Sequence, residues 1–148
     1  MTGDRPAHPI CWILVASTFI FTGCIATGPA FQRVNPIPSG KGVVYVYRSP
    51  GGGAPLIYGT VTANNTPIMK IRDGGYFPYI ADPGTVHFEV STEATSEADV
   101  TVEAGMEKYL KITIGHDFLV GRLNFTEVSP EIGSTEVKVC KLLKPCQP

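Results

Sequence analysis

The chain has 148 residues, with 12 Lys and Arg against 13 Asp and Glu and a formal net charge of −1 at pH 7. This length corresponds to a single globular domain with short additional segments. The charges are balanced and no basic cluster interleaves with aromatic residues, which excludes nucleic acid as an expected partner.

The first predicted element is an apolar segment, residues 10–21, that contains no charged residue, Gly or Pro. It is well short of the ~20 residues that a helix needs to cross a bilayer. A short polar stretch with one basic side chain, Arg5, precedes it, and small residues follow it. That order of regions predicts a secretory signal peptide over residues 1–23.

The four residues at the end of this segment, Phe-Thr-Gly-Cys at positions 21–24, resemble the lipobox of bacterial lipoproteins. The resemblance implies that fatty acids are attached to Cys24 and that the signal is cut just before it. Ile25 in place of Asp implies sorting to the outer membrane, on the periplasmic side. The alternative is an ordinary signal peptide cut near Ala26 or Ala30, with Cys24 lost.

The next segment, residues 24–42, consists of the lipidated cysteine and a stretch rich in Pro and Gly. Its apolar residues do not recur at the spacing of a helix or of a strand. This composition predicts a semi-extended linker, which at ~3 Å per residue would hold the domain up to roughly 50 Å from the lipid. The alternative is an N-terminal arm that packs on the domain through Phe31, Val34 and Ile37.

Residues 43–148 are predicted to form one all-β domain, a small Ig-like or prealbumin-like antiparallel sandwich. Runs of β-branched and aromatic residues alternate with turn residues, and Asn64-Asn65 tolerates the positive φ of a tight hairpin. In residues 131–136 we expect a helical turn, followed by an extended end. The predicted strands are residues 43–48, 55–63, 66–71, 76–80, 85–91, 99–103, 106–114 and 119–128.

Four segments of this domain carry a resemblance to a known family: Tyr45-Val46-Tyr47-Arg48 and residues 71–77, 82–87 and 102–109. Taken in order and together with the lipobox, they resemble a bacterial lipoprotein family classed by a domain of unknown function (domain of unknown function 2846). The resemblance covers residues 42–143. It implies a lipid-anchored β domain of the cell envelope and supplies no substrate, catalytic residue or cofactor.

Two histidines are candidates for chemistry. His87 lies on the polar face of a predicted strand and is expected to face solvent, since a single imidazole makes neither a metal site nor a catalytic pair. His116-Asp117 is the best acid–base candidate, but no nucleophile signature accompanies it. We therefore expect no catalytic residue, no cofactor and no enzyme activity, and a hydrolase that uses His116 is kept as an alternative.

Two further patterns receive structural interpretations. Residues 51–53, Gly-Gly-Gly, lack the remainder of a phosphate-binding loop and are expected to form a flexible loop. An acidic series between residues 89 and 103 is expected to be a solvated face, because calcium needs oxygen ligands at closer, loop-type spacing. The series is Glu89, Glu93, Glu97, Asp99 and Glu103.

Cys140 and Cys146 remain after removal of the signal and lipidation, in an exported protein where disulfides persist. A local disulfide between them is one prediction. The alternatives are a buried Cys140 with Cys146 free, or Cys146 paired with another chain.

The last functional hint is a group of aromatic residues, Tyr76, Phe77 and Tyr79. If they are exposed together, they would form a flat binding face for a protein or a sugar ring, and the alternative is that they fill the core. We therefore expect a non-enzymatic binding or structural module, tethered to the membrane through Cys24, for an envelope protein partner. The alternative is a glycan or peptidoglycan binding module, and nothing in the sequence sets the oligomeric state.

Overall fold

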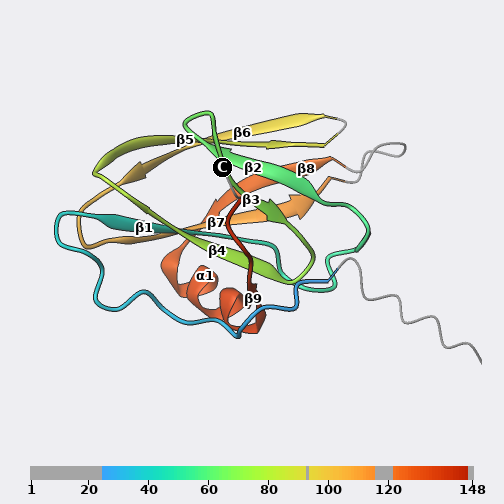
Figure 1. The fold of residues 1–148 in the computed structure, drawn as a ribbon, viewed down its shortest axis with the longest axis horizontal. Helices are drawn as coiled ribbons and strands as arrows, with labels where there is room; N and C mark the ends of the chain where they lie inside the picture. Colours follow the sequence, from blue (N-terminus) through green and yellow to red (C-terminus); the bar gives the residue numbers. More distant parts are fainter. Residues whose placement is uncertain (1–24, 93, 116–121, 147–148) are drawn as a thin grey trace, which may run out of the picture.

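The computed structural model describes residues 25–92, 94–115 and 122–146, and it confirms the predicted all-β fold. Two sheets pack face to face, and a short helix lies outside one of them (Figure 1). The elements are β1 (Gly42–Tyr47), β2 (Gly59–Ala63), β3 (Thr66–Ile71), β4 (Gly75–Ala81), β5 (Gly84–Ser91), β6 (Thr95–Val102), β7 (Glu107–Ile114), β8 (Leu123–Val128), α1 (Pro130–Glu136), the 3-10 turn η1 (Val137–Val139) and β9 (Lys141–Leu142).

The five-stranded sheet has the order β8-β7-β1-β4-β9, and the four-stranded sheet has the order β3-β2-β5-β6. Neighbouring strands are antiparallel except in the pairs β1–β7 and β4–β9, which are parallel. The Asn64-Asn65 hairpin is confirmed, with φ of 47° and 63° at its two central residues. All eight predicted strands are present, although β2 and β8 begin four residues later than expected and β6 four residues earlier.

The main core lies between the two sheets, and the side chains of each strand alternate between this core and the opposite face. On β5, Val86, Phe88 and Val90 point inward and are at most 4% exposed, while the residues between them are partly exposed. Leu110 and Ile112 of β7 meet them from the other sheet. Strand β5 is therefore half-buried, with one face in the core and the other in contact with solvent.

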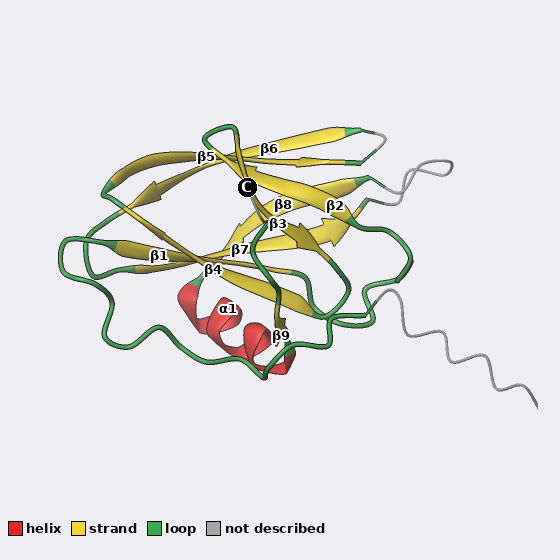
Figure 2. Ribbon diagram, in the orientation of Figure 1, coloured by secondary structure: helices red, strands yellow, loops and turns green. Residues whose placement is uncertain are grey.

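A second apolar cluster covers the outer face of the five-stranded sheet. The helix α1 lies against this face (Figure 2). Every residue of β1 is buried, since this strand lies between β7 and β4 and is covered on both faces. Gly133 of α1 is buried against the Tyr109 ring, where a Cβ atom would overlap the tyrosine. Glu136 accepts hydrogen bonds from the Tyr47 hydroxyl at 2.6 Å and the Lys111 ammonium at 2.8 Å, so the end of the helix is tied to the sheet.

Residues 25–41 form an arm that packs along the domain, and the predicted linker is corrected accordingly. Phe31 packs edge-on against Tyr45 and Tyr76, with ring centroids 5.4 and 5.0 Å apart. The Tyr45 hydroxyl accepts a hydrogen bond from the Val34 amide at 2.8 Å. Docking of Phe31, Val34 and Ile37 is the alternative that the sequence left open, and it buries apolar area that a free linker would expose to water.

The end of the chain combines a helix with a short extended segment, as expected for residues 131–136 and beyond. β9 pairs with β4, and the residues after it continue along the edge of β3, where the Cys146 amide donates to the Ile68 carbonyl at 2.9 Å. Within the described ranges, no helix has the length and apolar character needed to cross a bilayer.

Candidate functional site

The predicted aromatic binding face does not form. Tyr76, Phe77 and Tyr79 lie on β4, where successive side chains point to opposite faces. Tyr76 is 1% exposed in the second cluster, whereas Phe77 and Tyr79 pack on the main core, Tyr79 edge-on against Phe88 at 5.6 Å. The prediction was wrong because both faces of β4 are covered, one by the other sheet and one by the arm.

Cys140 and Cys146 are free thiols in the structure, so the predicted local disulfide is not formed. Cys140 is fully buried and its thiol contacts the Arg48 carbonyl oxygen at 3.6 Å. Burial raises the pKa of this thiol to about 12. Cys146 lies at the edge of β3, because the tail between the two cysteines runs past β9 in extended form instead of turning back.

Four residues of interest to the sequence analysis fall outside the described residues: Cys24, Glu93, His116 and Asp117. Lipidation of Cys24 stays a prediction, and acid–base chemistry at His116-Asp117 stays the alternative to the expected absence of a catalytic residue.

A buried arginine organises the glycine-rich loop, which therefore is not the free loop that the sequence predicted. Arg48 is 2% exposed, and its guanidinium donates to the carbonyl oxygens of Ile57 at 2.6 Å, Gly53 at 2.8 Å and Ala54 at 3.0 Å. The same group lies 3.6 Å from a carboxylate oxygen of the buried Asp73. Burial lowers the pKa of the guanidinium, and the Asp73 charge opposes this effect.

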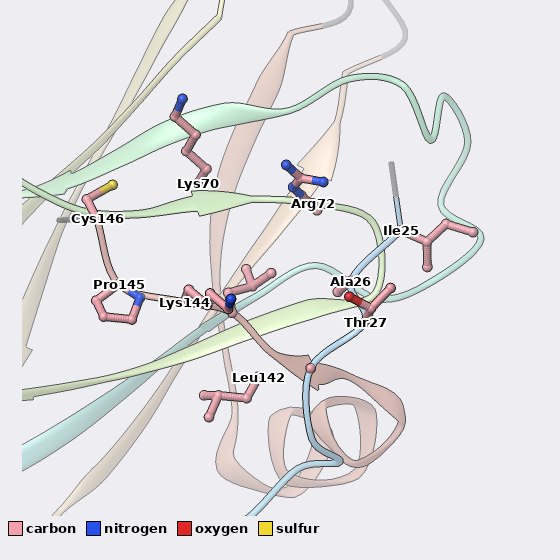
Figure 3. A pocket seen from close by; sticks show the side chains of 11 residues that line it. Ile25, Ala26, Thr27, Lys70, Arg72, Leu142, Lys144, Pro145 and Cys146 are labelled. Atoms are coloured by element: carbon pink, nitrogen blue, oxygen red, sulfur yellow. The ribbon is translucent and has the colours of Figure 1, made fainter. Parts of the chain in front are cut away.

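An open groove of about 740 Å³ lies between the arm, β3 and the C-terminal tail (Figure 3). A β-bridge joins Ile25 to Asp73, and the Leu142 amide donates to the Pro29 carbonyl at 2.8 Å, so arm and tail are fixed to each other. The groove is lined by residues 25–28, Lys70, Arg72 and residues 142–146.

The lining of this groove carries three basic side chains, Lys70, Arg72 and Lys144, and no acidic one. The chain as a whole is slightly acidic, so this is a local concentration of positive charge. Such a groove suits anionic groups, which Arg recognises through paired N–H donors and Lys as a point charge.

A smaller hollow of about 390 Å³ lies at the opposite end of the sandwich, between β7, β8 and the start of α1. Met106 contributes apolar surface there and is 49% exposed, beside Val128 and Pro130. Lys108 and Glu127 form an ion pair at 3.2 Å at its side. An apolar centre with a charged rim is the usual arrangement of a protein–protein contact.

His87 lies on the outer face of β5 with its side chain 38% exposed, as expected, but the β5–β6 hairpin brings it together with acidic residues, so it is not a single isolated imidazole. His87 pairs across the strands with Asp99, and Glu89 pairs with Glu97. The His87 Nδ1 atom lies 2.7 Å from the Asp99 carboxylate, and this hydrogen bond is the main cause that raises the pKa of the imidazole.

The same hairpin has the ligand types of a cation site. Because the Asp99 carboxylate accepts from Nδ1, the Nε2 atom of His87 is directed toward Glu97, 4.0 Å away. One ligand atom each from His87, Glu89 and Glu97 lies within 4.8 Å of the others, a set that could hold a divalent cation. All of these groups are half-buried or exposed.

Sequence reasoning missed both the groove and the hairpin cluster. The groove is built from three segments more than 40 residues apart, and no local pattern indicates that they meet. The cluster depends on the register between β5 and β6. The predicted sixth strand begins at residue 99, after Glu97, so the pairing of Glu97 with Glu89 could not be foreseen. No protein-family model, no curated protein and no solved structure matches the chain.

Proposed function

We propose that the chain is a lipid-anchored protein of the bacterial cell envelope whose β-sandwich is a non-enzymatic binding module for a protein partner. The lipid is carried by Cys24, and the outer membrane, facing the periplasm, is the expected location. The observation that carries the proposal is the separation of two surfaces: the arm begins at one end of the sandwich, and the Met106 surface lies at the other.

The register of β1 supports this separation. At its last residue, Tyr47 pairs with Tyr76, close to the Asp73 backbone to which Ile25 is joined. At the opposite end, Val43 pairs with Glu107, next to Met106. A strand of this length spans about 20 Å. A lipid on the residue before Ile25 would therefore hold the first end at the membrane and direct the second end away from it.

The chemistry of the distal surface favours a protein partner. Methionine adapts its shape to a contacting surface and is enriched in interfaces. Met106 and the exposed Ile80 both lie beside Val43, so two apolar side chains are presented at this end. The Lys41–Asp82 ion pair at 2.6 Å adds polar groups nearby.

The anchor is tested by metabolic labelling with an alkyne fatty acid in expressing bacteria. We expect label on the wild-type chain and none on Cys24→Ala, because the thiol is the acceptor of the diacylglycerol. Label that persists in Cys24→Ala would contradict lipidation at this residue.

The partner surface is tested by cross-linking the lipidated protein in its native membrane, followed by affinity capture and mass spectrometry. We expect one dominant cross-linked protein with the wild-type chain and its loss in Met106→Asp. Val139→Asp is the control, because it makes the same kind of change at a side chain that is 61% exposed on η1, away from the Met106 surface, and it should retain the cross-linked protein. Equal yields for both variants would exclude the Met106 surface. Wall glycan in place of a protein would support the glycan-binding alternative.

A further inference from the structure

We propose that the anchor end of the sandwich is a membrane-docking surface, in which the basic groove binds the phosphate groups of anionic lipids. This inference deepens the proposed function and rests on a lipid at Cys24. The occupant is the headgroup layer of the membrane that carries the anchor.

Covalent geometry sets the distance between groove and lipid. Ile25 lines the groove, and consecutive Cα atoms are about 3.8 Å apart, so an acylated Cys24 would adjoin the groove. The arm cannot extend to relieve this proximity without losing contacts, because the Ala26 amide donates to the Asp73 carbonyl at 3.1 Å and Ala26 is 7% exposed.

The charges of the groove complement an anionic surface. Lys70, Arg72 and Lys144 line it, and none of the residues that line it is acidic. The acidic cluster around His87 lies on the β5–β6 hairpin, and β6 and β3 are the two opposite edges of the same sheet. The basic edge of this sheet, at β3, lies beside the anchor, and the acidic cluster lies on β5 and β6, toward the other edge.

Apolar side chains at the same end fit the interfacial layer of a bilayer. Ile25 is 59% exposed, and in the loop before β2 Leu56 is 71% and Tyr58 60% exposed. Tyr58 precedes Gly59, which pairs with Ile71, the residue before Arg72, so the tyrosine and the arginine lie at one end of the β2–β3 pair. Tyrosine and basic residues beside exposed aliphatic side chains are typical of surfaces that rest on membranes.

The Arg48 contacts make this loop suitable for docking. Three guanidinium hydrogen bonds hold the backbone from Gly53 to Ile57, so Leu56 and Tyr58 are presented on a fixed segment. Each basic residue near an anionic surface strengthens membrane partition by about fivefold, which gives roughly 30-fold for the two groove lysines, Lys70 and Lys144, at low salt.

The test uses the lipidated protein, extracted from the membrane of expressing cells and reconstituted in vesicles. Trp12 is the only tryptophan in the sequence and lies in the predicted signal peptide. After removal of this peptide the chain has no tryptophan, so a single tryptophan introduced by substitution is the only fluorescent reporter of that kind. Tyr58→Trp reports on the anchor end and Ile80→Trp on the distal end. The vesicles contain phosphatidylcholine alone or with phosphatidylglycerol, each with a brominated lipid as quencher.

We expect the fluorescence of Tyr58→Trp to be quenched at least twofold more in the vesicles with phosphatidylglycerol, while Ile80→Trp stays unquenched in both. The increase should disappear in Lys70→Gln/Lys144→Gln and persist in Lys108→Gln/Lys138→Gln, which removes the same charge elsewhere. About 1 M salt should also abolish it, because the Debye length falls to about 3 Å.

Equal quenching of Tyr58→Trp in the two kinds of vesicle would overturn the inference. Flotation with phosphatidylcholine vesicles alone reports the lipid anchor independently of the groove. Protein that floats there without the phosphatidylglycerol effect keeps the anchor and loses the docking surface. Protein that floats only with phosphatidylglycerol keeps the lipid-binding groove and loses the anchor.

Discussion

Replacement of Arg48 by methionine should destabilise the domain more than any surface change. Arg48→Met keeps much of the side-chain volume and removes the charge that faces Asp73 together with three hydrogen bonds to loop carbonyls. Asp73 is 6% exposed and would remain as a buried charge without its cation. Removal of one partner from a buried ion pair costs about 3–5 kcal/mol.

A loss of this size is a large part of the roughly 5–15 kcal/mol that stabilises a typical domain. With a urea m-value of about 2 kcal/mol/M, it would lower the unfolding midpoint by about 2 M. The assay is urea unfolding followed by far-UV circular dichroism. Lys138→Met serves as control, since Lys138 is exposed on η1 and its replacement should change the free energy of unfolding by less than about 0.5 kcal/mol.

A double-mutant cycle with Asp73→Asn separates the ion pair from the loop contacts. Asparagine keeps an oxygen for the Gly51 amide, which donates to Asp73 at 3.2 Å, and removes the charge. The double variant should then be less destabilised than the sum of the single variants by about 1–3 kcal/mol. An Arg48→Met variant within about 1 kcal/mol of wild type would refute the view that this arginine holds the loop.

Three further predictions concern other parts of the domain. Because burial raises the pKa of the Cys140 thiol to about 12, iodoacetamide at pH 8 should modify Cys140 only in urea, and the free energy of unfolding should fall as pH rises above the ordinary thiol pKa. Rapid modification of Cys140 in the folded protein, distinguished by peptide mass from modification of the partly exposed Cys146, would contradict this. Gly133→Ala should cost about 1–3 kcal/mol in urea unfolding, because the new methyl group meets Tyr109; an unchanged midpoint would mean that the helix does not pack there. The pKa of His87, raised by Asp99, should return toward its ordinary value in Asp99→Asn when followed by NMR titration. The stabilisation from this contact should be present at low pH and lost as pH rises through the raised pKa. An equal His87 pKa in the two proteins would exclude the hydrogen bond as the cause.

The strands could be predicted because their signals are local. Alternation on β5 and the Asn64-Asn65 turn depend on neighbours in the sequence and on one buried face. The start of β6 could not be found in this way, because its first residues, Thr95 to Asp99, carry only Ser96 and Ala98 on the inner face and exposed polar side chains on the other. Their strand conformation comes from pairing with β5, which the sequence of β6 does not indicate.

The candidate surfaces could not be predicted because they depend on long-range packing. Whether Tyr76 is exposed is decided by Phe31, 45 positions earlier, whose ring covers it. The groove likewise requires that the arm and the tail meet at the edge of β3. Composition alone described the arm as a linker, since Pro and Gly suit both an extended tether and an irregular segment packed on a domain.

The packed arm changes the expected distance between the membrane and the proposed partner surface. As a free linker, residues 25–42 would let the domain range up to roughly 50 Å from its anchor. With the arm docked through Phe31, Val34 and Ile37, the domain would rest on the headgroups, and the Met106 surface would stand about one strand length, roughly 20 Å, above the anchor end. A partner that contacts this surface would then have to lie within or against the same membrane.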